Sequence, residues 1–229
     1  MFLSPFRHFN KKAFLIPFLF LLVNNAASQS ETTTNINAFK SSVLRENAGQ
    51  WEREILFQTS SSARNIYFLE NGLSFAITKN IEEKNDDAFS TENFHKTQTL
   101  VYNLLFEGCN KTTVSGKNSS PDNCNYLIGS KNFLNVADYK EIVYTAIYPH
   151  TDLRYYFNND LIEYDYVLKP GAIVGNIKMR YDGVEKISVN NNGDFLVQTR
   201  WGIQIEKKPF AYQIINGTKK EVPVNYTIY

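Results

Sequence analysis

Residues 152–166, DLRYYFNNDLIEYDY, hold two short runs of alternating polar and apolar side chains around an Asn-rich turn. Alternation with a period of two is typical of a β-strand that buries one face. Asn159-Asp160 supplies a two-residue turn, because Asn and Asp tolerate positive φ. The sequence therefore predicts a β-hairpin made of residues 152–157 and 161–168.

The same alternation predicts the register of this hairpin. With a two-residue turn, Arg154 faces Asp165 and Tyr156 faces Glu163. A slip of one residue would mix the polar and the aromatic faces, so only one register keeps them separate. We expect Glu163 and Asp165 on a solvated strand face. We expect the other face to be buried, and it holds Leu153, Tyr155, Phe157, Ile162, Tyr164 and Tyr166.

Strand patterns of this kind recur along the chain. Asn71-Gly72 joins two further strands into a hairpin, because Asn-Gly readily takes positive φ at both central turn positions. Turn residues then follow about every 8 to 12 positions. These features predict a single all-β domain, an antiparallel β-sandwich-like fold. The expected strands are 53–58, 65–69, 73–78, 99–107, 139–148, 152–157, 161–168, 175–181, 184–189, 194–199, 203–206, 210–215 and 221–229.

Two segments lack strand patterns. Residues 79–98 are rich in charge and poor in apolar side chains, which predicts a solvated loop. Residues 108–125 are rich in Asn, Ser, Thr and Lys and are bracketed by Cys109 and Cys124, the two cysteines of the chain. Exported proteins with two cysteines usually pair them. We expect a Cys109–Cys124 disulfide across this loop, with two free thiols in strands as the alternative.

The N-terminus has the three parts of a secretory signal peptide. Arg7, Lys11 and Lys12 form a basic flank, residues 13–23 an apolar run, and Ala26-Ala27-Ser28 an end of small residues. The run is too short to cross a bilayer, which takes about 20 apolar residues. We therefore expect a cleaved signal peptide and an exported protein, secreted or at the cell surface; a buried N-terminal helix is the alternative.

Cleavage would divide the chain into a signal peptide (1–28), a linker (29–38) and an all-β domain (39–229). Removing three basic residues takes the formal charge from +1 to −2. A chain without a basic block is a poor partner for nucleic acid, because phosphates are neutralised by clustered Lys and Arg. No later apolar run has membrane length, so we expect no transmembrane segment in the mature chain.

Residues that could carry catalysis are few. His95 lies in the charged segment, and His150 lies two residues before Asp152 without a Ser or Cys in a nucleophile turn nearby. Glu163, Asp165 and Asp152 could form the carboxylate pair of a glycoside hydrolase. Pairing with Arg154 across the strands is the simpler interpretation, so we expect no catalytic residue, no metal site and no cofactor.

Aromatic side chains offer a second possible function. Flat exposed aromatic rings bind sugars, and Trp51 and Trp201 both flank turns. Core packing is the simpler explanation for the aromatic residues at strand positions. These are Tyr144, Tyr148, Tyr155, Tyr164 and Tyr166.

A series of short motifs resembles a known family. The chain is similar to a domain of unknown function found in exported proteins of Bacteroidetes-type bacteria, over about residues 39–229. The match begins at Asn47-Ala48-Gly49-Gln50-Trp51, which resembles the family's N-x-G-Q-W opening. The later motifs follow in the family's order: 106–108 (FEG), 125–129 (NYLIG), 148–153 (YPHTDL), 161–167 (LIEYDYV), 169–172 (KPGA) and 209–213 (PFAYQ).

The resemblance supplies no activity and no catalytic residue that could be carried over to this chain. In that family the domain stands at the N-terminus of long surface proteins, before β-propeller (SBBP-type) repeats and a sorting domain of gliding motility and type IX secretion. This chain departs from the pattern in the turn at 149–152, which lacks the usual glycine, and it stops in the strand-like residues 224–229. It is therefore expected to be a fragment or a stand-alone copy.

Together these features predict a structural or interaction domain of an exported bacterial protein. Its expected partners are unknown beyond surface glycans or other domains of a longer protein. A glycan-binding or adhesive module that uses exposed aromatic residues is the first alternative. A hydrolase that uses Glu163, Asp165 or Asp152 is the second.

The signal peptide makes a direct prediction. The mature N-terminus is Gln29, because signal peptidases cut after small residues such as those at 26–28. Mass spectrometry of protein released from cells should show Gln29, free or as pyroglutamate. Released protein that still begins at Met1 would contradict the prediction.

Overall fold

The computed structural model describes residues 14–19, 42–61, 63–82, 95–158 and 160–229. Within these ranges the chain folds almost entirely into β-strands, and no α-helix occurs among them. One turn of 3-10 helix, η1 (Val174–Asn176), lies between two strands. Every strand pairing described is antiparallel, which confirms the all-β antiparallel prediction.

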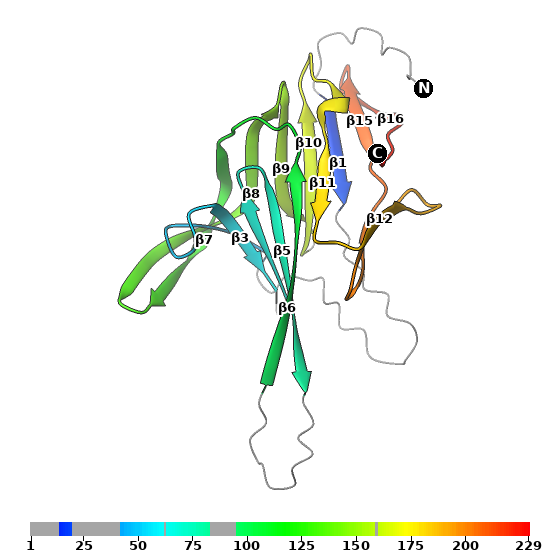
Figure 1. Cartoon of the computed structure of the whole chain (residues 1–229). Helices are drawn as coiled ribbons and strands as arrows, with labels where there is room; N and C mark the ends of the chain where they lie inside the picture. Colours follow the sequence, from blue (N-terminus) through cyan, green and yellow to red (C-terminus); the bar gives the residue numbers. More distant parts are fainter. Residues whose placement is uncertain (1–13, 20–41, 62, 83–94, 159) are drawn as a thin grey trace.

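The strands form one large and one small sheet (Figure 1). The small sheet has the order β12–β13–β14, made of Lys186–Val189, Phe195–Thr199 and Gly202–Glu206. The large sheet has 13 described strands in the order β11-β6-β5-β4-β3-β2-β8-β9-β10-β1-β15-β16, and β7 pairs with β8 outside this path. Its strands are β1 (Phe14–Leu19), β2 (Leu44–Glu46), β3 (Ile55–Ser60), β4 (Arg64–Leu69), β5 (Gly72–Glu82), β6 (His95–Phe106), β7 (Val114–Ile128), β8 (Lys131–Tyr148), β9 (Thr151–Asn158), β10 (Leu161–Leu168), β11 (Met179–Asp182), β15 (Ala211–Ile215) and β16 (Thr218–Val222).

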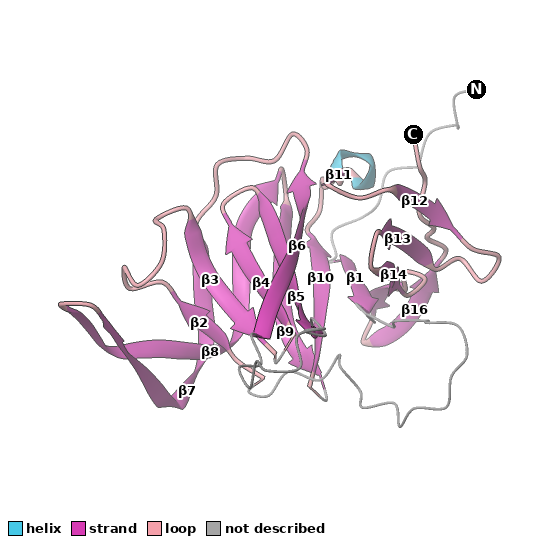
Figure 2. Cartoon of the chain, turned by 60° about the horizontal axis from the view of Figure 1, so that its bottom comes forward, coloured by secondary structure: helices cyan, strands magenta, loops and turns pink. Residues whose placement is uncertain are grey.

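The large sheet curls into a half-barrel, and the small sheet lies at its open side (Figure 2). Aromatic side chains from several strands meet inside the curl. Phe68 contacts Tyr155 edge to face at 5.1 Å between ring centroids, and Phe75 stacks on Tyr102 at 4.7 Å. Edge-to-face and offset aromatic pairs each contribute about 0.5–1.5 kcal/mol beyond the burial of their area. A concave aromatic core therefore replaces the flat layer expected between two sandwich sheets.

The charged segment 79–98, predicted to be a loop, is strand at both of its ends. β5 and β6 continue past the body of the sheet and pair as far as Glu82 opposite His95. Both ends of the predicted loop are therefore strands, and residues 83–94 lie outside the described part of the chain. Charged residues suit such strands, because a two-stranded extension has both faces in water.

The segment 108–125 is also a strand for most of its length, so the disulfide prediction is wrong. Val114 lies opposite Tyr144 and Cys124 opposite Val136, eight residues along β8, or about 26 Å of extended strand. A disulfide needs Cα atoms within about 7 Å. Cys109 and Cys124 are both free. The sequence missed this strand because a ribbon solvated on both faces needs no apolar alternation.

At the N-terminus the alternative of a buried helix, and at the C-terminus the predicted strand, differ from the structure. Residues 14–19, the centre of the predicted signal peptide, form β1 between β10 and β15 rather than a buried helix. The last strand, β16, ends at Val222, and residues 223–229 follow it without regular structure. The predicted strand 221–229 is therefore mostly absent.

A close contact in the β7–β8 ribbon gives a testable prediction. A Cβ at Gly116 would lie 2.3 Å from Cγ of Tyr139, whose ring covers this glycine. Gly116→Ala must displace the ring, and we expect it to lower the free energy of unfolding by about 1–3 kcal/mol. Gly175→Ala is the matched control, because no atom lies within 4 Å of its added Cβ. Urea unfolding of both variants measures the difference; equal stabilities would show that Tyr139 gives way freely.

Candidate functional site

The β9–β10 hairpin places the predicted charged residues together. Asp165 lies opposite Arg154 and Tyr164 opposite Tyr155, as the separated faces predict. Arg154 donates to Oδ2 of Asp165 from Nε at 2.8 Å and from Nη2 at 2.5 Å. The Tyr156 hydroxyl donates toward Glu163 Oε2, at 3.0 Å. The carboxylates of β10 thus belong to a connected polar network on one face of the strand.

The expectation that Asp165 is solvated is wrong. Its side chain is 1% exposed, whereas Arg154 keeps a third of its side chain in solvent. Burial raises the pKa of the Asp165 carboxyl, and the Arg154 guanidinium acts in the opposite direction by favouring the ionised form. The pair is therefore a partly buried salt bridge. An interaction of this kind holds the hairpin register, and it accounts for the buried position of this carboxylate.

Asp152, the third hydrolase candidate, has a structural task. Its Oδ1 accepts a hydrogen bond from the amide of Ala146 at 2.8 Å, and its Oδ2 lies 2.6 Å from Lys169 Nζ. Ala146 has φ +51 at an irregularity of β8, where the register with β9 shifts. The carboxylate therefore stabilises a bulge, as short polar side chains commonly do beside strained backbone.

The two histidines do not join these carboxylates. His150 has φ +58 in the exposed turn between β8 and β9, and its carbonyl accepts from the Lys169 amide. His95 is the first residue of β6, at the end of the long β5–β6 ribbon. The tyrosines considered as a sugar platform are all buried by the core: Tyr144, Tyr148, Tyr155, Tyr164 and Tyr166.

The N-A-G-Q-W motif folds into a loop whose own side chains hydrogen-bond its backbone. The Asn47 amide nitrogen donates to the carbonyls of Glu52 and Ile55 at 2.8 and 2.7 Å, and its oxygen accepts from the Gly49 and Trp51 amides. Gly49 has φ +106, a conformation that side chains disfavour. The polar residues of the motif are thus used to fix the backbone, and the loop delivers Trp51 to the surface.

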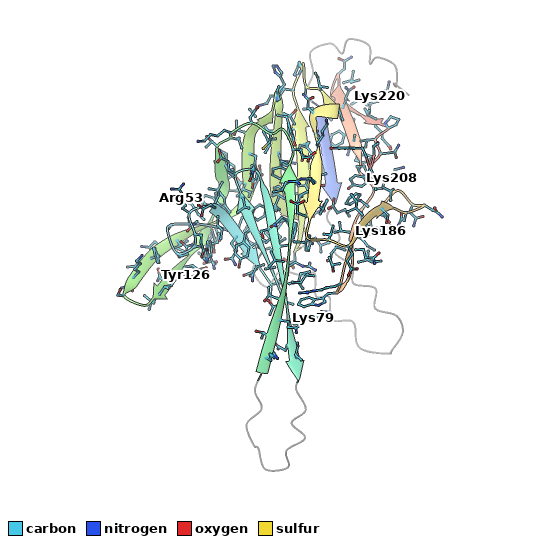
Figure 3. All side chains as sticks on the ribbon, in the orientation of Figure 1. Arg53, Lys79, Tyr126, Lys186, Lys208 and Lys220 are labelled. Carbon is cyan, nitrogen blue, oxygen red and sulfur yellow. The ribbon has the colours of Figure 1, made fainter. Side chains whose placement is uncertain are left out.

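Trp51 lies beside aromatic and charged groups at the base of the β7–β8 ribbon. Its ring meets Tyr126 edge to face at 5.6 Å. Arg45 donates to the Tyr126 hydroxyl at 3.0 Å and forms a two-bond salt bridge with Asp138, both bonds being 2.7 Å. Figure 3 labels Tyr126 on the β7–β8 ribbon. Bidentate pairing of Arg45 fixes this corner in one geometry.

Two surface cavities adjoin this corner. One of about 460 Å³ is lined by the N-A-G-Q-W loop, including Trp51. The other, of about 740 Å³, lies between Glu54, Glu70 and Lys111. Both are lined in part by Arg53 and Leu56, so the two cavities are neighbours, and charged side chains of both signs line them. None of the hydrolase candidates Glu163, Asp165 and Asp152 lines either cavity.

The β7–β8 ribbon itself projects from the body of the protein (Figures 1 and 2). Its outer part carries three exposed apolar side chains: Leu127 is 74% exposed, Leu134 62% and Ile128 47%. Among the described strands β7 pairs with β8 alone, so its other edge presents free backbone groups. We call Leu127, Ile128 and Leu134 the ribbon tip. By strand alternation Leu127 and Leu134 lie on one face of the ribbon and Ile128 on the other. Exposed apolar side chains on a projecting ribbon are typical of a contact surface.

A buried carboxylate that the sequence does not reveal lies inside the half-barrel. Glu206, at the end of β14, is 1% exposed. It accepts from the hydroxyls of Tyr181 and Tyr164, the latter at 3.1 Å, and Tyr226 Oη lies 3.4 Å away. Burial raises the pKa of Glu206 to about 7, although the tyrosine hydroxyls favour its ionised form. Its charge thus changes near neutral pH.

A second polar contact docks the same strand. Gln204, two residues before Glu206 on β14, accepts from Nη2 of the buried Arg64 at 3.0 Å. Burial also lowers the pKa of Arg64. Strand β14 thus turns a polar face toward the large sheet, the reverse of the usual arrangement. The sequence predicts the strand at 203–206, but not that Gln204 and Glu206 face the large sheet.

Other site types have no support within the described ranges. No cluster of three or more His, Cys, Asp or Glu side chains there could bind a metal ion. The same part of the chain holds no helix that is both long and apolar enough to cross a membrane.

Comparison with known proteins gives one match. A family model described as a domain of unknown function (DUF7948) matches residues 44–229. No curated protein and no solved structure matches the chain. The matched range begins at β2, so it includes the N-A-G-Q-W loop, the ribbon and the Glu206 site.

The raised pKa of Glu206 predicts a pH-dependent stability. The folded protein holds the proton more tightly than the unfolded chain, so the free energy of unfolding falls as the pH rises from about 4.5 to about 7. The full change is about 3 kcal/mol at 1.36 kcal/mol per pH unit. Glu206→Gln should flatten the stability profile in this window, as measured by urea unfolding at each pH. Glu54→Gln, at an exposed side chain, is the control and should keep the wild-type slope. A Glu206→Gln variant with that slope would assign the dependence elsewhere.

Proposed function

The chain belongs to the DUF7948 family of domains of unknown function, and we propose that this member is a non-catalytic interaction domain of an exported bacterial protein, secreted or held at the cell surface. The observation that carries the proposal is the ribbon tip. Leu127, Ile128 and Leu134 stand in solvent on a projecting two-stranded arm. A contact with a partner would remove these side chains from water at about 25 cal/mol per Å² of apolar area.

The arrangement of the carboxylates supports a non-catalytic role. A glycosidase needs two carboxyl groups facing a common substrate space at about 5–10 Å separation. Here Asp165 is paired with Arg154, Asp152 with Lys169, and Glu206 is enclosed by tyrosine hydroxyls. Each group has an intramolecular partner that accounts for its position.

The N-terminal sequence and the family resemblance support export. Residues 1–28 have the order of a signal peptide, a basic flank before an apolar run and small residues. The resemblance adds a finer proposal, that the domain stands at the N-terminus of a longer Bacteroidetes surface protein with β-propeller repeats and a sorting domain for type IX secretion and gliding motility. In such a protein the ribbon would contact a neighbouring domain or another surface protein.

A second candidate function is glycan binding at the cavity beside Trp51. A ring held at a cavity by a rigid loop, next to charged and amide groups, is suited to stack on a sugar. This candidate uses Trp51 and Tyr126 and leaves the ribbon tip without a role, so the two functions can be separated by mutation.

A photo-crosslinking experiment tests the ribbon. A benzoyl-phenylalanine placed at Leu134 and irradiated in the intact host cells should give one discrete adduct. Added wild-type domain should suppress that adduct, and a Leu127→Asp/Leu134→Asp domain should not. Ile173 is the matched control position, because it is also 62% exposed but lies beside η1, away from the ribbon. It should give no adduct.

Other results would point elsewhere. Equal labelling at Leu134 and Ile173, or adducts unaffected by competition, would count against the ribbon as a contact surface. Binding to a glycan array that disappears in Trp51→Ala would favour the glycan-binding function. Glycoside hydrolysis that disappears in Asp165→Asn would favour an enzyme.

A further inference from the structure

Strand β1 fills a position of one strand width in the large sheet. It pairs antiparallel with β10 along its whole length, from Phe14 opposite Leu168 to Leu19 opposite Glu163. It also pairs antiparallel with β15, at Phe14 opposite Gln213 and Leu15 opposite Tyr212. β10 and β15 are therefore parallel to each other and separated by this one strand.

Among the described strands, β1 is the sole link between the β15–β16 hairpin and the rest of the large sheet. Residues 14–19 are also the centre of the segment that a signal peptidase removes, if the chain is exported as proposed. Removal would leave backbone groups unpaired along residues 163–168 of β10 and along β15. Unpaired strand edges readily accept another strand.

We propose that the exported domain uses this position as a strand-binding groove, which accepts an extended apolar segment of a partner protein. The proposal rests on the proposed export and adds the class of ligand to the proposed interaction function. Main-chain hydrogen bonds to both edges would supply affinity, and the side-chain positions on the two faces would supply selectivity.

The register defines the sequence that fits. The core-facing residues of β10 are Tyr164, Tyr166 and Leu168, all nearly inaccessible to solvent. The positions of β1 opposite them hold Phe18, Ile16 and Phe14. Directly opposite residues of antiparallel strands share one face of the sheet. A ligand strand therefore needs about six residues with large apolar side chains at alternate positions.

Contacts independent of β1 hold the far side of the groove in place. Ala211 of β15 is buried in the core, and Val222 of β16 packs against it. Tyr226, just beyond the hairpin, donates toward Glu206 and the Lys207 carbonyl, at 3.4 and 3.2 Å. Direct closure of the gap would require the hairpin to shift by about 4.8 Å, one strand spacing, and would disturb these contacts. An incoming strand leaves them intact.

A peptide-binding experiment tests the groove. The protein is collected after export from cells that express residues 1–229, and its N-terminus is read by mass spectrometry. The probe is a fluorescent peptide of residues 12–20, with added lysines at both ends for solubility. Saturable binding measured by anisotropy is expected for the cleaved protein, together with slower hydrogen exchange of the amides at 163–168. Uncleaved protein purified from the cytoplasm should not bind, because β1 already fills the groove.

Two peptide variants test the register. Ile16→Ser lies opposite the core-facing Tyr166 and should weaken binding at least tenfold. Leu15→Ser lies opposite Val167 on the other face and should weaken it less than threefold. Equal effects of the two substitutions would overturn the assigned register, and with it the groove.

Three further results would overturn the proposal. The first is exported protein that retains residues 14–19. The second is slow hydrogen exchange of the amides at 163–168 in a monomer without peptide, which would mean that the gap closes or is filled by another segment of the same chain. The third is concentration-dependent protection in a dimer, which would make a second copy the occupant. None of these results affects crosslinking from Leu134. The groove proposal can therefore be overturned while the proposal of the ribbon as a contact surface stands, and the reverse is also true.

Discussion

The half-barrel is held closed by the burial of one carboxylate between strands that are far apart in the sheet. Glu206 accepts from Tyr181 on β11, the edge strand, and from Tyr164 on β10, which is separated from β11 by seven strands in the sheet order. An isolated buried carboxylate is strongly unfavourable, so the tyrosine hydroxyls must replace most of its lost hydration. The carboxyl group can meet both strands only when the sheet is curled. Glu206 therefore has these two hydrogen-bond partners only because the sheet is curved.

The curvature of the large sheet determines which groups lie inside the half-barrel and which lie on its outer surface. The concave face is filled by aromatic rings and by strand β14, whose Gln204 also contacts Arg64. The N-A-G-Q-W loop and the ribbon tip lie away from this interior, where changes of side chain cost little core packing. A rigid interior with exposed, projecting elements is the usual way in which a scaffold carries binding surfaces.

Much of the fold could be predicted from local patterns, and the failures have a common cause. The register of Arg154 with Asp165 follows from alternation, because both faces of that hairpin differ in polarity. The β7 strand was missed because a ribbon exposed on both faces has no alternation to detect. Gln204 and Glu206 were missed for the opposite reason, since their pattern predicts that Ile203 and Ile205 face the core. Their burial depends on Arg64, Tyr164 and Tyr181, which come from distant parts of the chain, and local sequence cannot reveal such partners. The ribbon tip was not predicted, because local sequence does not show that the β7–β8 ribbon projects from the body of the protein.

The perturbed Glu206 raises the question of whether it marks an active site, since shifted pKa values gather at catalytic centres. Three features argue for a structural role instead. Its oxygens are engaged by tyrosines of the core, its side chain is 1% exposed, and the two surface cavities of the ribbon base are lined by other residues. A catalytic acid needs a path to a substrate, whereas a closing contact needs water to be excluded. The same burial that raises the pKa of Glu206 also keeps its carboxyl group away from the surface, which suits a contact that closes the half-barrel.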